Sequence, residues 1–134
     1  MSLEQNKTNV LNMYRAFDRQ DIERGRQFIA ADIIGRGMDG IIRQGVASFI
    51  EYAMSMFGVF PDGYHQIDEI IAEGDKVVTR GIFSATHKGE LMGILPTNKK
   101  IQFSVVHIDR IADGKIIQHW GQADLFSVMQ QLRK

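Results

Sequence analysis

The fold can be inferred from the segment IQFSVVHIDRIADGKIIQHWGQ, residues 101–122. Residues 101–111 and 115–122 are two runs rich in Val, Ile and Phe, and they flank the tripeptide Ala112-Asp113-Gly114. An Asp-Gly pair between apolar runs is a strong signal for a β-hairpin, because both residues tolerate positive φ angles. We therefore predict two long antiparallel strands near the end of the chain.

The segments before this hairpin, 65–72 and 76–87, repeat the pattern around Glu73-Gly74-Asp75, which predicts a second hairpin. The first sixty or so residues instead have apolar residues at helical spacing, interrupted by a glycine-punctuated, β-branched stretch over 33–44 that suggests a short irregular strand. We expect helices over 3–18, 22–30, 46–57 and from about Leu125 onward. Helices first and strands later indicate an α+β fold, in which N-terminal helices pack on a curved antiparallel or mixed sheet and enclose a pocket.

Length and composition narrow the class of protein. The chain has 134 residues, of which 44% are hydrophobic and 24% charged, and this predicts one globular domain over residues 1–134. Its 16 basic and 16 acidic residues balance, so long-range attraction to nucleic acid is not expected. The chain has no cysteine and no signal-peptide pattern, and no apolar run approaches the roughly 20 residues of a membrane span. We expect a cytoplasmic protein that binds neither membranes nor nucleic acid.

The second half of the chain carries four stretches in a characteristic order. They are IAEGDKVV (71–78), THKGELMGI (86–94) followed by Pro96-Thr97, DRIADGKI (109–116), and His119-Trp120 with Asp124-Leu125 and Gln130-Gln131-Leu132. Together they cover most of residues 65–132 and resemble the SnoaL-like polyketide cyclases, which belong to the nuclear transport factor 2-like superfamily. The resemblance implies a conical fold around a cavity, where acid/base chemistry acts on apolar ketones without a metal or organic cofactor.

Two positions bear on that chemistry. The resemblance implies ring closure by an aldol step, with an aspartate as acid/base and a histidine beside it, and His107 matches the histidine. The aspartate is expected two residues after the histidine of the DGKI…H stretch, where this chain has Gly121. An unperturbed imidazole titrates at about pH 6.5, so His107 is the best remaining proton-transfer candidate. The alternative is a core histidine satisfied by one hydrogen bond.

The register of the last hairpin decides which side chains share a face with His107. A two-residue turn at Asp113-Gly114 would place His107 opposite Trp120, whereas a three-residue loop would place it opposite His119. We favour the three-residue loop, because the family resemblance puts positions 107 and 121 on one cavity wall.

Other side chains are candidates for the cavity wall or for the chemistry. The candidate ligand-binding residues are Tyr14, Phe57, Val105, His119, Trp120 and Gly121. Tyr14 could offer its hydroxyl to a ligand carbonyl or simply pack in the core, and Trp120 could lie under a planar ligand or fill the core. Asp124 is a second acid/base candidate if a bulge near Gly121 turns it inward, but it is also well placed to cap the last helix. The four histidines lack metal-ligand spacing, so no metal site is expected.

Three functions stay open on this basis. The first is a cyclase- or isomerase-type acid/base enzyme for a small apolar ketone with one or several rings, with His107 as base and Asp124 or His119 as helper. The second is a small-molecule binding module without chemistry, which the absence of the family aspartate favours. The third is an epoxide-hydrolase-like enzyme, for which Arg80 and Asp109 are available but no convincing triad can be assigned.

The outer face of the predicted sheet leads to one further expectation. If His107 points into the cavity, Val106, Ile108 and Ile117 should lie on the opposite face, where a monomer would leave them in water. An exposed apolar patch of this kind usually marks a contact site, so we expect a homodimer.

Overall fold

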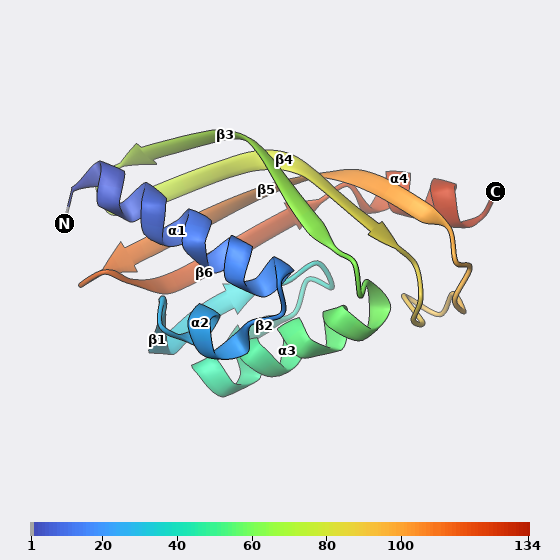
Figure 1. Ribbon diagram of the computed structural model, residues 1–134, viewed down its shortest axis with the longest axis horizontal. Helices are drawn as coiled ribbons and strands as arrows, with labels where there is room; N and C mark the ends of the chain where they lie inside the picture. Colours follow the sequence, from blue (N-terminus) through green and yellow to red (C-terminus); the bar gives the residue numbers. More distant parts are fainter. Residues whose placement is uncertain (1) are drawn as a thin grey trace.

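The computed structural model describes residues 2–134, and Figure 1 shows helices packed against one strongly curved sheet. In chain order the elements are α1 (Leu3–Asp18), α2 (Ile22–Arg26), β1 (Ile29–Arg36), β2 (Ile42–Gln44), α3 (Val46–Val59), β3 (Tyr64–Glu73), β4 (Lys76–Thr86), β5 (Lys100–Ala112), β6 (Lys115–Ala123) and α4 (Leu125–Leu132). The predicted α+β architecture, with N-terminal helices on a curved sheet, is confirmed.

The strands form one mixed sheet in the order β2-β1-β6-β5-β4-β3. Neighbouring strands are antiparallel except β1 and β6, which run parallel. The two predicted hairpins are β3–β4 and β5–β6, and β1 extends the sheet beyond β6 (Figure 1). Within residues 2–134, no helix is long and apolar enough to cross a membrane.

The first helix forms as its sequence predicts. The side chain of Ser2 accepts the N–H of Gln5, and the side chain of Gln5 accepts the N–H of Ser2, which completes a capping box. The buried face of α1 includes Val10, Met13 and Tyr14 and packs on β3 and β4. This packing carries Tyr14 into the interior, above the middle of the sheet.

The second helix is shorter than predicted. It ends at Arg26, and Ile29 already belongs to β1 rather than to a helix. Ile29 pairs with Ile116 of β6, and the N–H of Ile116 donates to the carbonyl oxygen of Phe28. Pairing with a strand from the far end of the chain thus outweighs the local helical pattern, as tertiary context often does.

The last hairpin has a two-residue turn, so the favoured three-residue loop is wrong. Asp113 (φ 50°) and Gly114 (φ 77°) both adopt left-handed conformations, and Ala112 pairs with Lys115. Two consecutive left-handed residues are the requirement of a type I′ turn, whose twist matches that of the flanking strands.

A β-bulge at Ile117 then changes the register, so that neither predicted pairing occurs. Arg110 pairs with Gln118, and His107 pairs with Gly121 rather than with Trp120 or His119. Because side chains alternate along a strand, one extra residue exchanges the faces of the rest of β6. His107 and Gly121 therefore share the concave face, as the family resemblance implied.

Candidate active site

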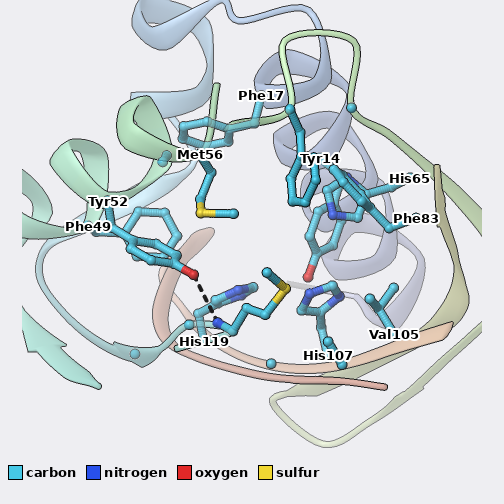
Figure 2. Close-up of a pocket in the computed structure, with 18 of the residues that line it drawn as sticks. Tyr14, Phe17, Phe49, Tyr52, Met56, His65, Phe83, Val105, His107 and His119 are labelled. Atoms are coloured by element: carbon cyan, nitrogen blue, oxygen red, sulfur yellow. Dashed lines mark hydrogen bonds between the residues drawn. The ribbon is translucent and has the colours of Figure 1, made fainter. Parts of the chain in front are cut away.

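A cavity of about 200 Å³ lies between α1, α3 and the concave face of the sheet (Figure 2). Most of its wall is aromatic or aliphatic, and this part includes Met13, Phe17, Phe49, Met56, Phe57, Phe60, Phe83, Phe103 and Val105. The polar side chains include Tyr14 and three histidines, His65, His107 and His119. A wall of this kind suits an apolar ligand that is oriented by a few polar contacts.

Asp109 organises one side of the cavity. Its carboxylate is fully buried, and the Tyr14 hydroxyl donates to Oδ2 at 2.9 Å. The ring of His119 lies on the other carboxylate oxygen, with Nδ1 at 2.6 Å from Oδ1. A carboxylate accepts both contacts, so Nδ1 of His119 carries a hydrogen and Nε2 is the nitrogen without a partner in Asp109. Burial, together with the Asp109 charge, raises the pKa of Tyr14 well above its usual value.

His107 lies beside Tyr14 and His119, and its two ring nitrogens have no hydrogen-bond partner among residues 2–134. It stacks on His119, with ring centroids 5.1 Å apart and an interplanar angle of 24°, and its centroid is also 5.1 Å from that of Tyr14. Burial, and secondarily the neighbouring His119 and His65, hold the pKa of His107 well below 6.5. The imidazole is therefore neutral at pH 7, with one nitrogen lone pair available to a ligand.

At Gly121 the cavity wall is formed by the backbone alone. A Cβ atom built at this position would lie 3.0 Å from Cδ2 and 3.4 Å from Nε2 of His107. Any residue other than glycine would thus press on the imidazole, which would have to shift by a few tenths of an ångström. The position that the family resemblance assigns to a carboxylate is therefore in contact with His107.

Six of the eight predicted site residues line the cavity. They are Tyr14, Phe57, Val105, His107, His119 and Gly121. Tyr14 does so with its hydroxyl hydrogen committed to Asp109, so the prediction that it donates to a ligand carbonyl does not fit this arrangement.

Trp120 and Asp124 lie elsewhere, and both corrections follow from the local backbone. The bulge puts Trp120 opposite Ile108 on the outer face, where its Nε1–H donates to Gln118 at 3.2 Å. Asp124 is the N-cap of α4, and its carboxylate accepts the N–H of Ser127 at 3.1 Å. Neither residue reaches the cavity.

The positions of Arg80 and Asp109 also do not support the epoxide-hydrolase-like hypothesis. Arg80 lies on the outer face, where its guanidinium pairs with Glu69 at 2.6 Å, while Asp109 is buried on the inner face. An Asp-Arg-Asp relay cannot be built from groups on opposite faces of a sheet.

The roles of two polar groups were not predicted from the sequence. Asp109 was considered only together with Arg80 for an epoxide-hydrolase-like relay, and His65 appeared only as the first residue of a predicted strand. His65 pairs with Asp18 at the end of α1, 47 positions earlier in the chain. Only the packing of α1 on β3 brings these two together, and no sequence pattern gives that signal.

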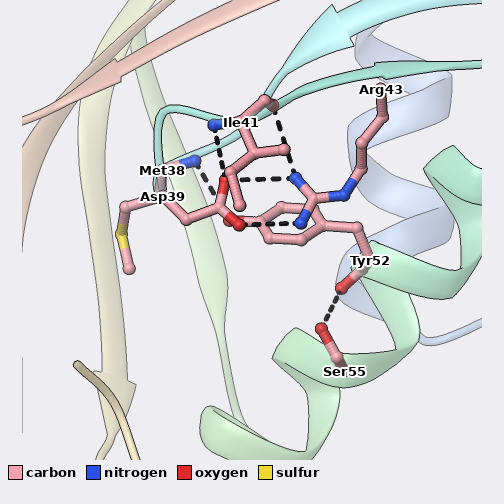
Figure 3. A network of polar contacts seen from close by, with 6 residues as sticks. All are labelled: Met38, Asp39, Ile41, Arg43, Tyr52 and Ser55. Atoms are coloured by element: carbon pink, nitrogen blue, oxygen red, sulfur yellow. Dashed lines mark hydrogen bonds and ion pairs between the residues drawn. The ribbon is translucent and has the colours of Figure 1, made fainter. Parts of the chain in front are cut away.

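Met38, Arg43 and Tyr52 of the cavity wall belong to a polar network, which Figure 3 shows. The guanidinium of Arg43 binds Asp39 through two contacts, at 2.7 and 3.1 Å, and lies 4.1 Å from the ring centroid of Tyr52. The hydroxyl of Tyr52 accepts the N–H of Met38 at 3.0 Å. The hydrogen bonds from Arg43 lower the pKa of Asp39. This network holds the segment 37–43 against α3.

Comparisons with known proteins agree with this fold. The sequence pattern of the SnoaL-like polyketide cyclase family matches residues 8–132. A candidate polyketide cyclase from Acidithiobacillus ferrooxidans is 28% identical, with a TM-score of 0.85 over 99% of this chain and 98% of that chain. IdmH, a candidate polyketide cyclase from Streptomyces antibioticus, is 27% identical, with a TM-score of 0.84 over 97% of this chain and 99% of IdmH.

A third solved structure carries a different description. AclR, a candidate hydroxylase from Streptomyces galilaeus, is 27% identical, with a TM-score of 0.85 over 98% of this chain and 83% of AclR. No curated protein matches the chain. Because the family pattern spans nearly the whole sequence and the solved relatives share its fold, the chain belongs to the SnoaL-like polyketide cyclase family.

Proposed function

We propose that the cavity carries out acid/base chemistry on a small apolar carbonyl compound, with formation of an enolate as the central step. The observation that carries this proposal is the neutral, unpartnered imidazole of His107 facing an apolar cavity. Enolisation needs a positioned base, and such a base typically contributes ~10²–10⁴ in rate. Aldol ring closure and double-bond isomerisation both begin with this step.

His107 has the role of base in this proposal. A ring nitrogen takes the proton from the carbon next to the carbonyl group, the C–H electron pair forms the C=C bond of the enolate, and the carbonyl π pair moves to oxygen. The low pKa of His107 keeps the imidazole unprotonated at neutral pH, so every molecule is in the competent state. His119 offers Nε2 to a hydroxyl group of the same ligand, because Asp109 holds its Nδ1–H.

The wall of the cavity supports a ligand that is small and mainly apolar. The cavity has a volume of about 200 Å³, below the range of roughly 300–1,000 Å³ that is usual for pockets that bind drug-sized ligands. We therefore expect a ketone of one or two rings to be bound better than a larger polycyclic one.

The test is hydrogen exchange at the carbon next to the carbonyl group. The probe is 2-tetralone in D₂O at pH 7, followed by proton NMR with and without enzyme. The protein should accelerate exchange, and His107→Gln should lower the acceleration by ~10²–10⁴. Asp124→Asn is a suitable control, since this residue caps α4 outside the cavity, and it should exchange at the wild-type rate. Full exchange in His107→Gln would show that another group is the base.

A non-catalytic binding module of the same fold is the second candidate, and one observation favours it. Gly121 provides no carboxylate where the family resemblance implies one. A ligand that raises the melting temperature, without any exchange or turnover over a panel of enolisable ketones, would support this candidate over the enzyme.

A further inference from the structure

A second Asp–His pair lies in the same cavity, at the end of α1. Nδ1 of His65 is 2.7 Å from Oδ1 of Asp18, and the backbone N–H of His65 donates to Oδ2 at 3.0 Å. Because both carboxylate oxygens act as acceptors, Nδ1 carries a hydrogen, and Nε2 is the nitrogen that can bind and release a proton. In many enzymes a carboxylate in this position fixes the tautomer and the orientation of a catalytic histidine.

His65 is close to the proposed base. Its ring centroid is 5.7 Å from that of His107 and 5.2 Å from that of Tyr14. Figure 2 shows His119 beside His107, and His65 next to Tyr14 and Phe83. His65 and His119 both line the cavity, and each is held by its own aspartate.

The two pairs differ in their access to water. The side chains of His65 and Asp18 are 20% and 11% exposed, against 13% and 0% for His119 and Asp109. A proton can therefore be exchanged with solvent more readily at His65 than at the inner pair. The group nearest to water is the natural place for the proton that enters or leaves during each turnover.

We propose that His65, oriented by Asp18, is a second proton-transfer residue that acts on a different atom of the ligand from His107. This inference rests on the proposed function. In an aldol ring closure, His107 takes the proton from carbon, the C=C pair of the enolate forms the bond to a second carbonyl carbon, and a lone pair of the enolate oxygen restores the first C=O bond. The π pair of the second carbonyl group moves to its oxygen, which takes the proton that Nε2 of His65 has bound from water. His107 then returns its proton to water, so the number of protons is unchanged over the cycle.

The variant His65→Asn separates this role from a structural one. The amide nitrogen of asparagine lies near the place of Nδ1, so it can still donate to Asp18, while the Nε2 atom is removed. Glu69→Gln is the matched control, because this residue lies on the same strand but pairs with Arg80 on the outer face. Melting temperatures of both variants verify that the fold is kept.

The probe is 2-(3-oxobutyl)cyclohexanone, an apolar diketone that can exchange its α-hydrogens and can also close a second ring. We expect His65→Asn to lower the rate of ring closure at least about tenfold more than the rate of exchange, and Glu69→Gln to change neither. Equal rates in His65→Asn and the wild type, or equal losses in both reactions, would overturn the proposal. If the wild-type protein accelerates neither reaction, the proposed function itself fails and this proposal with it.

A spectroscopic readout tests the positioning role of Asp18 without turnover. Long-range proton–nitrogen NMR spectra distinguish the two neutral tautomers of histidine. His65 should be in the Nδ1–H form in the wild type, and Asp18→Asn should shift it toward the Nε2–H form. A neutral wild-type His65 found in the Nε2–H form would overturn the assignment, because Nδ1 would then carry no hydrogen for Asp18 to accept.

Discussion

The middle of β5 and β6 reverses the usual distribution of polar and apolar side chains, whereas the rest of β5 keeps it. His107, Asp109 and His119 lie on the concave face, and Asp109 is completely buried. On the outer face, Val106 and Ile108 are 38% and 41% exposed. Elsewhere on β5 the buried positions are apolar, as at Ile101 and Phe103, which is the general rule in soluble proteins. The reversed segment is therefore where we place the proposed chemistry and the proposed contact.

The inner polar groups are tolerable because most of them have partners. A buried carboxylate without hydrogen bonds is strongly unfavourable, whereas Asp109 accepts from Tyr14 and from His119. His107, the group without a partner, avoids the cost by staying neutral. Removing one of these inner groups therefore leaves another without its partner. Substitutions on the inner face should lower the free energy of unfolding more than substitutions on the outer face.

The largest effect is expected from Asp109→Asn. An amide has an NH₂ donor in place of one carboxylate oxygen, so Tyr14 must turn its hydroxyl hydrogen away or His119 must move its hydrogen to Nε2. One hydrogen bond to a buried charged group is lost, which typically costs about 1–3 kcal/mol in the free energy of unfolding. Urea denaturation measures this change. Asp68→Asn, on the partly exposed outer surface near Arg80, should be close to wild type, and equal stability of the two variants would contradict the role given to Asp109.

The next effect is a pH dependence of stability that comes from His107. Its pKa is lower in the folded than in the unfolded chain, so the unfolded chain binds more protons below pH 6.5. Stability should therefore fall as the pH drops through this range, by at most about 1.4 kcal/mol per pH unit from this residue. The His107→Gln variant has no imidazole to protonate at this position. In urea titrations, its free energy of unfolding should therefore fall less between pH 7 and pH 5 than that of the wild type. Parallel curves for both proteins would disprove this origin.

An effect of similar size on stability is expected from Gly121→Asp. The new Cβ atom meets the ring of His107 at about van der Waals distance or closer, and such overpacking costs roughly 1–3 kcal/mol. The new carboxylate should also raise the pKa of His107, because an opposite charge favours the protonated ring. Gly121→Ala is the control that has the steric effect without the charge. NMR titration of His107 should separate the two variants, and identical pKa values would contradict the contact.

The smallest effect on the fold is expected on the outer face. We propose that Val106 and Ile108 lie in a homodimer contact, since a monomer leaves them in water. Ile108→Lys should then convert a particle of twice the chain mass of 15.2 kDa into a monomer, while surface substitutions usually change stability by less than about 0.5 kcal/mol. Light scattering at micromolar concentration measures the mass. Leu95→Lys, in an exposed loop, is the control, and a wild-type monomer would refute the dimer.

Much of the fold could be read from local signals. The Ser2–Gln5 capping box, the hairpin around Asp113-Gly114 and the alternation along β5 depend on residues close in sequence, and the structure contains all three. The length of the hairpin loop was nevertheless predicted wrongly, since it has two residues and not three. The end of α2 and the start of β1 could not be read in this way, because Ile29 is held by Ile116 from the far end of the chain.

For the site, the sequence by itself determined that His107 lies on a strand of the cavity wall and that Gly121 stands where a carboxylate was implied. Only the tertiary structure decided their surroundings. The bulge at Ile117 turned Trp120 outward and His119 inward, and the packing of α1 on the sheet brought Tyr14 to Asp109. The physical reason is that periodicity gives the face of a side chain within its own strand. Its partners depend on register and on contacts between distant segments, which no local pattern encodes.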